Sequence, residues 1–518
     1  MDDSQDATAT ATALDSERCY AAMREKDVRF DGRFFVGVKT TGIFCRPVCP
    51  APLPKASNCS FWPSAAAAQG AGFRPCFRCR PESAPGTPAW RGTAASVSRA
   101  LRLIEAGALD HGETVDALAA RLGISARHLR RLFDVYLGAT PRAVARMRRT
   151  LFAKQLIDET DLAMKEIAPS AGFSSQRRFN ACVREVYGTS PSALRARRRG
   201  KPTHIGAEES RGAIEITLRY RPPFAWDALL VFFRLRAIPG VEQVTPDCYA
   251  RTVRMPEGSG LIEVRNDVGR SCLRVSYWGK GLVGLIELQG KLRRVFDLDA
   301  DAEAIDAHLA ESRLLRGQIR AQPGYRVPGA YDGFETAVRG ILGQQVSVKG
   351  ATTISGRVAS RFGDALGALG GRVHSALGAE ERGLSHLFPT PSQLVEAPLE
   401  EVGLIRSRAA TIRGLAKATL EDPLLLEPAE SLDAGVERLT ALPGIGPWTA
   451  HYVAMRVLRE SDACPVSDLV LRQRISEPGA APRPAKDVAQ LLEPTRPFRA
   501  YAAMRVWALP ESGGGQEK

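Results

Sequence analysis

Two closely spaced cysteine pairs carry the first candidate chemistry in this sequence. Cys45 and Cys49 are separated by three residues, and Cys76 and Cys79 are separated by two. Two such pairs joined by a loop have the spacing of a tetrahedral zinc site, and closed sites with four cysteine ligands are mostly structural. Four thiolates around one Zn²⁺ leave a net charge of −2. Cys59 lies between the pairs, and we expect it to be a small buried residue and not a fifth ligand.

An aspartate that follows a glycine-rich turn carries the second candidate chemistry. The run Leu442-Pro443-Gly444-Ile445-Gly446 predicts a tight turn between two helices, because glycine allows a close approach of the backbone. The N–H groups that open the next helix form an anion site that would suit a DNA phosphate. Asp468 stands where a further helix is expected to begin. From these residues alone, Asp468 is either a helix N-cap or a reactive carboxylate.

The composition favours a multidomain partner of an anionic molecule. The chain has 518 residues, a net charge of +14 and a pI of about 9.5, so we expect about three to five domains and attraction to a polyanion. Five of its ten cysteines lie between Cys45 and Cys79, a clustering that indicates a metal site in a cytosolic protein. No apolar run is long enough to cross a membrane, and the polar N-terminus has no signal core. We therefore expect a cytoplasmic protein.

The cysteine-bearing region resembles the N-terminal domain of the Ada family over residues 17–83. The resemblance is carried by the residues around each pair, 42–50 and 72–79. It implies that Cys45 accepts a methyl group from a methylphosphotriester in DNA. It also implies one Zn²⁺ held by Cys45, Cys49, Cys76 and Cys79, because thiolate is the nucleophile and zinc keeps it deprotonated. Transfer would change the site charge from −2 to −1 and tighten DNA binding.

The next region contains two helix-turn-helix patterns. Residues 115–125 predict a helix, a glycine turn and a serine-capped second helix, and residues 165–179 repeat this pattern. Together with the run 187–191 they resemble the AraC-type DNA-binding domain over residues 93–199. The alternative is a helical bundle with an arginine-rich solvated face. The side chains expected to contact DNA are Arg127, Arg130, Arg131, Gln176, Arg177 and Arg178. Pro169 is expected to kink the first helix of the second unit.

The C-terminal region combines strand and helix signals. Apolar residues alternate at Ile214, Ile216 and Leu218, further strands are predicted at 261–264 and 273–277, and a helix at 226–235. This pattern predicts an α+β domain with an antiparallel sheet at 211–320 and a helical domain at 321–510. The runs 220–226 and 334–348, with the glycine-rich turn, resemble the AlkA family of helix-hairpin-helix DNA glycosylases.

This resemblance implies a role for each matching residue. Asp468 would stabilise the cationic sugar formed as the glycosidic bond breaks. Aromatic side chains would surround the extruded, alkylated base, and the turns would contact the DNA backbone or fill the gap that the base leaves. Trp448 stands where lyase-type relatives carry a lysine, so we predict a hydrolytic enzyme without lyase activity. The base pocket would contain Trp448, Tyr452, Trp507 and Phe224. The DNA contacts would include Gly444, Gly446, Gln344 and Gln345.

The predicted architecture is multidomain and mainly α with α+β parts: a small zinc-binding α/β domain, a double helix-turn-helix, and the two glycosylase domains, with tails at 1–16 and 511–518. The predicted function is excision of alkylated bases such as 3-methyladenine, with methyl transfer to Cys45 switching on sequence-specific DNA binding. The alternative is a transcription regulator whose glycosylase-like module binds DNA but is inactive. We expect a monomer that binds alkylated and promoter DNA and RNA polymerase, with no cofactor for the glycosylase chemistry.

Overall fold

The computed structural model describes residues 14–81, 84, 95–110, 112–197, 213–279, 281–366, 383–429, 431–477 and 479–509. The chain divides into two compact units, residues 1–201 and residues 202–518. Residues 1–13 of the predicted N-terminal tail and the whole predicted C-terminal tail lie outside the described residues. Among the helices that are described, none is long and apolar enough to cross a membrane.

A small four-stranded sheet carries the cysteine pairs. The strand order is β3-β1-β2-β4, with β1 antiparallel to β2 and β3 and with β4 parallel to β2. Gly37 allows the Phe73 ring to pack closely against β1, because a Cβ at residue 37 would lie 2.8 Å from that ring. The predicted small α/β domain is confirmed. Its elements are α1 (Ser16–Arg24), β1 (Phe35–Val38), β2 (Ile43–Cys45), β3 (Cys59–Trp62), α2 (Ala65–Gly70) and β4 (Arg74–Pro75).

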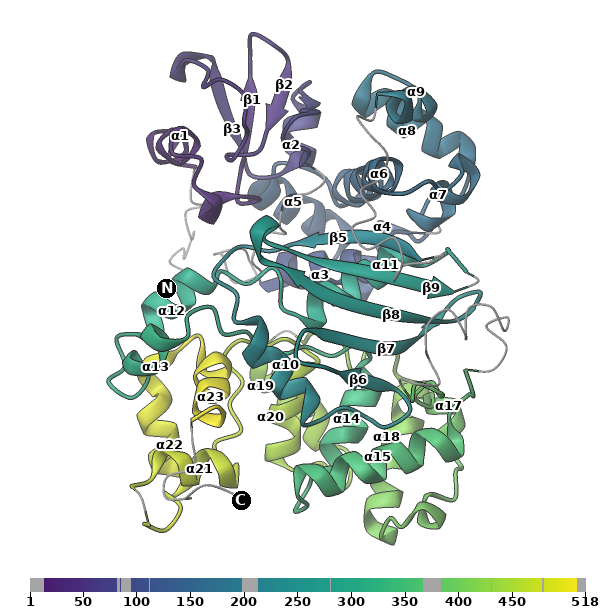
Figure 1. Cartoon of the computed structure of the whole chain (residues 1–518), viewed down its shortest axis with the longest axis vertical. Helices are drawn as coiled ribbons and strands as arrows, with labels where there is room; N and C mark the ends of the chain where they lie inside the picture. Colours follow the sequence, from purple (N-terminus) through teal and green to yellow (C-terminus); the bar gives the residue numbers. More distant parts are fainter. Residues whose placement is uncertain are drawn as a thin grey trace, which may run out of the picture. The chain divides into compact units, whose positions relative to one another are not determined.

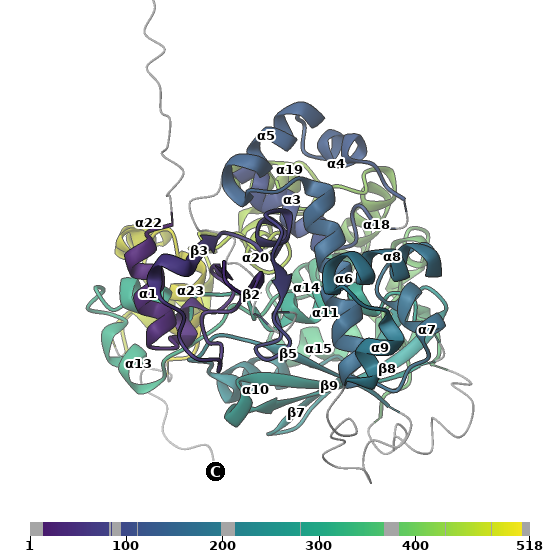
Figure 2. The same ribbon diagram turned by 90° about the horizontal axis from the view of Figure 1, so that it is seen from above.

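Both predicted helix-turn-helix units are present in residues 95–197. The second helix of each unit is capped by serine: the Ser125 hydroxyl accepts the His128 N–H at 3.2 Å, and the Ser175 hydroxyl accepts the Arg178 N–H at 3.3 Å. Each ends at a left-handed glycine, Gly138 or Gly188, because that conformation suits glycine. Helix α6 lies beside α8 and α9 (Figure 2). The elements are α3 (Ala95–Glu105), α4 (Val115–Arg121), α5 (Ala126–Leu137), α6 (Pro141–Glu159), α7 (Met164–Ser170), α8 (Gln176–Tyr187) and α9 (Pro191–Ala196).

Pro169 lies inside α7, as the sequence indicates, and α7 nevertheless forms and is followed by α8. It is the penultimate residue of the helix. A missing amide at this position removes the hydrogen bond to one carbonyl only. The other end of α7 is held by the Glu166 carboxylate, which accepts the Ala163 N–H at 2.7 Å. The second unit therefore keeps both of its helices.

The C-terminal compact unit, residues 202–518, contains a five-stranded antiparallel sheet of order β5-β9-β8-β7-β6 (Figure 1). The three predicted strands and the predicted helix are confirmed, and Ile216 and Leu218 of β5 point into the core. Strands β6 and β7 were not predicted. The elements are β5 (Ile214–Arg219), α10 (Trp226–Arg234), β6 (Glu242–Val244), β7 (Cys248–Met255), β8 (Gly258–Asp267), β9 (Cys272–Gly279), α11 (Leu285–Val295), α12 (Ala302–Leu309) and α13 (Arg316–Ala321).

A helical part completes this unit and confirms the predicted combination of α+β and all-α regions. Helix α14 packs against α18 and α20, and α19 and α20 form the predicted hairpin. The elements are α14 (Gly333–Leu342), α15 (Val348–Phe362), α17 (Pro391–Leu394), α18 (Arg406–Glu421), α19 (Leu432–Thr440), α20 (Pro447–Arg456), α21 (Leu469–Ile475), α22 (Ala485–Leu492) and α23 (Arg499–Trp507).

A buried ion network joins the sheet to the helical part. Arg251 of β7 donates to the Glu335 carboxylate of α14 at 2.7 Å, and Arg339 of α14 donates to Glu242 of β6 at 2.9 Å. The side chains of Arg251, Glu242 and Glu335 are each no more than 4% exposed. Removing one partner of such a pair leaves a buried charge unpaired, which is strongly destabilising.

We predict that Arg251→Ala lowers the free energy of unfolding of this unit by about 3 kcal/mol, because Glu335 loses its 2.7 Å partner and keeps only Arg339 at 3.4 Å. Urea unfolding followed by tryptophan fluorescence measures this, since four of the six tryptophans lie in residues 202–518. The matched control is Arg254→Ala on the same strand, whose pair with Asp364 is largely exposed and is expected to contribute less than about 1 kcal/mol. Equal effects of the two substitutions would contradict the prediction.

Candidate functional sites

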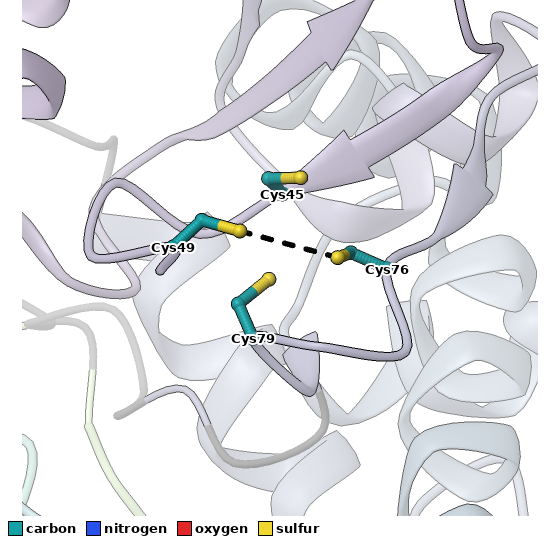
Figure 3. A group of neighbouring side chains, drawn as sticks. All are labelled: Cys45, Cys49, Cys76 and Cys79. Carbon is teal, nitrogen blue, oxygen red and sulfur yellow. Dashed lines mark hydrogen bonds between the residues drawn. The ribbon is translucent and has the colours of Figure 1, made fainter. Parts of the chain in front are cut away.

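The four predicted metal ligands converge in the N-terminal unit. The sulfur atoms of Cys45, Cys49, Cys76 and Cys79 all lie within 4.8 Å of one another, and those of Cys49 and Cys76 are 4.0 Å apart. The four side chains point toward a common centre, with Cys45 at the end of β2 (Figure 3). A tetrahedron with Zn–S bonds of about 2.3 Å has sulfur atoms about 3.8 Å apart. The residues therefore fit a zinc ion.

The four sulfur atoms are not equivalent. The Arg46 N–H donates to the Cys79 sulfur at 3.3 Å, and the Arg78 N–H donates to the Cys76 sulfur at 3.4 Å. Cys45 is half-buried, whereas its three partners are buried. The Arg46 guanidinium donates to the Cys79 carbonyl at 2.9 Å and pairs with buried Asp31. This pairing holds the loop after Cys45 against the second cysteine pair.

Cys59 lies outside this cluster, as predicted. It packs among the buried residues of the small sheet, next to Phe34 and Val36. Burial raises the pKa of its thiol, which keeps the sulfur protonated. It is therefore a core residue.

The residues predicted to contact DNA in the helix-turn-helix units lie at the start of α5 and α8. Arg127, Arg130 and Arg131 are exposed on α5, and Arg177 and Arg178 are exposed on α8. Gln176 is the first residue of α8 and is half-buried. Exposed basic side chains on the second helix of each unit are the expected electrostatic footprint of DNA binding.

In the C-terminal unit, Asp468 is both the N-cap of α21 and the centre of a convergent group. Its Oδ1 accepts the Leu471 N–H at 2.8 Å and the Trp507 indole N–H at 2.9 Å. Its Oδ2 accepts the Trp448 indole N–H at 2.8 Å. Helices α20, α21 and α23 each supply one donor, so the carboxylate is fixed by three separate elements. The capping role and the candidate reactive role are therefore not alternatives.

Trp448 and Tyr452 stack one helical turn apart on α20. Their ring centroids are 5.6 Å apart with planes at 8°. Arg456, a further turn along, donates to the Tyr452 hydroxyl at 2.6 Å. Burial alone would raise the pKa of the Tyr452 phenol, but the guanidinium groups of Arg456, Arg236 and Arg339 together lower it. The predicted pocket residues Trp448, Tyr452 and Trp507 thus form one cluster with Asp468.

Phe224 is placed elsewhere, so its prediction as a pocket residue needs correction. Its ring lies 4.5 Å from the Tyr220 ring and 5.9 Å from the Trp226 ring, and the Arg326 guanidinium lies 5.3 Å from it. These are packing contacts of the α+β part. The run 220–226 carries the family resemblance, but Tyr220 and Trp226 are core residues and the half-buried Phe224 packs against them.

Phe232 of α10 and Arg236, which lies in the turn after α10, adjoin the Tyr452–Arg456 pair, and the sequence did not predict either of them. The Phe232 ring lies 4.0 Å from the Arg236 guanidinium and 5.0 Å from that of Arg456. Burial lowers the pKa of Arg236 to about 10. In the sequence, the spacing of four residues between Tyr452 and Arg456 predicts that these two side chains meet on one face of a helix. It does not predict that Phe232 and Arg236 join them.

The glycine-rich turn has the close approach that the sequence predicts. Gly444 has a φ of +85°, and a Cβ there would lie 1.9 Å from the Thr411 hydroxyl of α18. Gly446 is the N-cap of α20 and has no side chain that could accept from the first N–H groups of the helix. Both glycines are exposed.

The two neighbouring glutamines differ in their surroundings. Gln344 donates from its amide to the Gly444 carbonyl at 3.1 Å and to the Thr449 hydroxyl at 2.9 Å, which ties its loop to the hairpin. Gln345 is exposed and left-handed, with a φ of +54°. Gln345 therefore combines an uncommon backbone conformation with an exposed side chain. It suits insertion into DNA better than Gln344, whose side chain is held by the hairpin.

Four family models match successive parts of the chain. Metal binding domain of Ada matches residues 18–82, and a helix-turn-helix domain matches residues 118–197. AlkA N-terminal domain matches residues 215–332, and the HhH-GPD superfamily of base excision DNA repair proteins matches residues 338–497.

Curated relatives combine the same parts. A probable bifunctional transcriptional activator/DNA repair enzyme AlkA of Mycobacterium tuberculosis is 40% identical over 500 residues, which cover 96% of this chain and 97% of that protein. DNA-3-methyladenine glycosylase 2 of Escherichia coli is 32% identical over 56% of this chain and 96% of its own length. Bifunctional transcriptional activator/DNA repair enzyme Ada of Escherichia coli is 33% identical over 36% of this chain and 50% of its own length. The chain therefore belongs to the AlkA/Ada family of bifunctional proteins, in which an Ada-type metal-binding domain and a helix-turn-helix domain precede an AlkA-type base-excision repair module.

Proposed function

We propose that the C-terminal unit hydrolyses the glycosidic bond of alkylated bases such as 3-methyladenine in DNA, and that the N-terminal unit accepts methyl groups from DNA methylphosphotriesters on Cys45. The observation that carries the first part is the Asp468 carboxylate, held by two indole N–H groups and a helix N-terminus beside the stacked pair Trp448 and Tyr452. A rigid anion next to aromatic rings suits a reaction in which positive charge develops on the sugar of an extruded nucleotide.

Asp468 acts mainly as a fixed negative charge. Three N–H donors already use both of its oxygen atoms, so the group is positioned before substrate arrives and needs little reorganisation as the sugar becomes cationic. The base leaves with the electron pair of the glycosidic bond, and a water molecule adds its oxygen to the sugar carbon and gives up one proton to solvent. The carboxylate also orients this water.

The hairpin supports hydrolysis without strand cleavage. Relatives with lyase activity attack the sugar through a lysine amine, which becomes bonded to that carbon. In this chain Trp448 occupies the corresponding place, and its indole N–H donates a hydrogen bond to Asp468. The module therefore has no amine nucleophile at this point of the hairpin.

The surroundings of Tyr452 refine the choice of substrate. Electron-rich rings attract a cationic base by about 0.5–2 kcal/mol each, but three guanidinium groups lie close enough to Tyr452 to lower its pKa. These charges oppose a positive base at the Tyr452 end of the cluster. We therefore assign the attraction for a cationic base to Trp448 and to the Asp468 charge. Leu469, which follows Asp468, is 54% exposed and adds no ring.

The second part of the proposal is carried by the unequal surroundings of the four sulfur atoms. A bound Zn²⁺ would keep all four cysteines as thiolates at neutral pH. N–H groups donate to Cys76 and Cys79 and withdraw electron density from those sulfur atoms. Cys45 is the least buried of the four. Its sulfur would bond to the methyl carbon as the carbon–oxygen bond of the phosphotriester breaks, which leaves an anionic phosphodiester.

Transfer of the methyl group would link repair to transcription. The site charge falls from −2 to −1, so the N-terminal unit is repelled less by DNA phosphates, and the exposed arginines of α5 and α8 can bind a promoter. We propose RNA polymerase as a further partner of a monomeric activator at the bacterial nucleoid, with one zinc ion per chain and no cofactor for base excision. The competing function is a regulator with an inactive glycosylase-like module. The preorganised Asp468 favours the active enzyme.

We predict that Asp468→Asn slows base release at least about a hundredfold, because an amide lacks the charge that stabilises the cationic sugar. Release of free 3-methyladenine from methylated DNA measures the rate, and a gel-shift assay measures retained DNA binding. The exposed carboxylate Asp487 provides the control Asp487→Asn, which should act as wild type. Release at the wild-type rate by Asp468→Asn would contradict the catalytic role of Asp468, whereas no release by the wild type would favour the regulator.

Replacing either indole by phenyl tests the positioning of Asp468. Trp448→Phe and Trp507→Phe keep an aromatic ring but lose one charge-assisted hydrogen bond, so kcat is expected to fall about tenfold for each with little change in KM. Trp278→Phe, a buried tryptophan of β9, is the control for loss of indole volume. A rise in KM at constant kcat would show that the two rings serve base binding alone and do not position the carboxylate.

We predict that Cys45→Ala gains no methyl group when the protein is incubated with DNA that contains methylphosphotriesters. Intact-mass measurement detects one added methyl in the wild type and in Cys59→Ala, because Cys59 lies in the core and outside the cluster. Methylation of Cys45→Ala to the wild-type extent would exclude Cys45 as the acceptor.

A further inference from the structure

The loop that carries the second cysteine pair also contacts the helix-turn-helix domain of the N-terminal unit. Phe77 lies between the ligands Cys76 and Cys79, and its ring centroid is 6.0 Å from that of Tyr187, the last residue of α8. The Lys154 ammonium of α6 lies 5.8 Å from the Phe77 ring and 5.9 Å from the Tyr187 ring. One cation therefore contacts two aromatic rings that belong to different domains.

An ion pair extends this contact next to the last ligand. Arg80 follows Cys79 by one residue, and its guanidinium lies 3.1 Å from the Asp158 carboxylate and 3.5 Å from that of Glu159, at the end of α6. Asp158 also accepts from Lys154 at 2.5 Å. Asp158 and Glu159 are only 14% and 15% exposed, so solvent screens these pairs weakly.

A second contact joins the metal-binding domain to the first helix-turn-helix unit. Ser64, the N-cap of α2, donates from its hydroxyl to the Leu137 carbonyl at 2.9 Å. Gly138 follows, and a Cβ there would lie 3.2 Å from the Ala67 side chain. The two contacts therefore fall at equivalent places, the C-terminal ends of α5 and α8.

The contact with α8 depends on the conformation of the cysteine loop. The Arg78 N–H donates to the Cys76 sulfur, and Arg80 has a φ of +52°, an uncommon conformation that its surroundings must maintain. Four thiolates at these distances repel one another unless a cation binds them. Loss of the metal would therefore release the segment that presents Phe77 and Arg80, whereas Ser64 lies outside that segment.

We propose that the loop Cys76–Arg80 couples metal binding at the four cysteines to the packing of the second helix-turn-helix unit. With metal bound, Phe77 and Arg80 hold the ends of α6 and α8 together. Without it, this contact is lost and the end of α8 opens more often. The metal-binding domain is thus a support for DNA recognition as well as a reactive site.

Hydrogen–deuterium exchange of the full chain tests this coupling. We expect chelation of zinc to raise amide exchange in the C-terminal half of α8 about tenfold, because local opening becomes easier, with α20 unchanged as an internal reference. Phe77→Ala and Arg80→Ala should show the same rise while still binding one zinc. Leu53→Ala, which removes an equally exposed apolar side chain of the same domain, is the matched control and should keep wild-type exchange.

A variant on the other side of the contact separates coupling from damage to the metal site. Asp158→Asn combined with Glu159→Gln removes the two carboxylates at the end of α6 that pair with Arg80 and touches no cysteine, so zinc content should stay at the wild-type level while α8 exchange rises. Unchanged exchange in α8 after chelation of the wild type would overturn the proposal. So would wild-type protection of α8 in the zinc-bound Asp158/Glu159 variant, because the loop would then be a passive contact.

Discussion

The carboxylate of Asp468 accepts three N–H groups from three helices, and the helical half of the glycosylase unit is arranged around this requirement. Trp448 reaches it because the hairpin turn lets α20 begin at Pro447, and Trp507 reaches it because it is the last residue of α23. An ionised carboxylate is costly to bury unless hydrogen bonds replace its hydration. The hydrogen bonds that offset the cost of burying the Asp468 carboxylate also fix its orientation. The stability of the site and its proposed chemistry therefore have the same cause.

A comparable constraint governs the cysteine cluster. Four sulfur atoms within 4.8 Å form a stable arrangement only around a cation, and the backbone N–H groups of Arg46 and Arg78 assist two of them. Both sites thus consist of anionic groups held by donors from the surrounding fold. They differ in what is left accessible: a half-buried sulfur in one unit, and a carboxylate beside stacked rings in the other.

The sequence predicted residues within motifs better than it predicted their neighbours. Cys45, Cys49, Cys76 and Cys79 converge as their spacing indicates, because closely spaced pairs on short turns have few ways to bind one ion. Phe224 belongs to the packing of the α+β part, although it lies in a run that resembles the family. Its place next to Tyr220 results from a local turn, whereas Phe232 reaches the Tyr452 group because α10 packs near α20. Sequence adjacency to a motif does not determine which side of a helix faces another domain.

By itself the sequence determined the order of the domains, the ligand set of the metal site, and the presence of Asp468 after a glycine-rich hairpin. These properties depend on residue type and short-range spacing, which turn and helix geometry translate directly into structure. Only the tertiary structure decided that two tryptophan indoles bind Asp468, that three arginines surround Tyr452, and that the Cys76–Arg80 loop contacts α6 and α8. Such contacts join residues from 20 to 39 positions apart around Asp468 and farther elsewhere, and they form because separate helices must bury their apolar faces against one another.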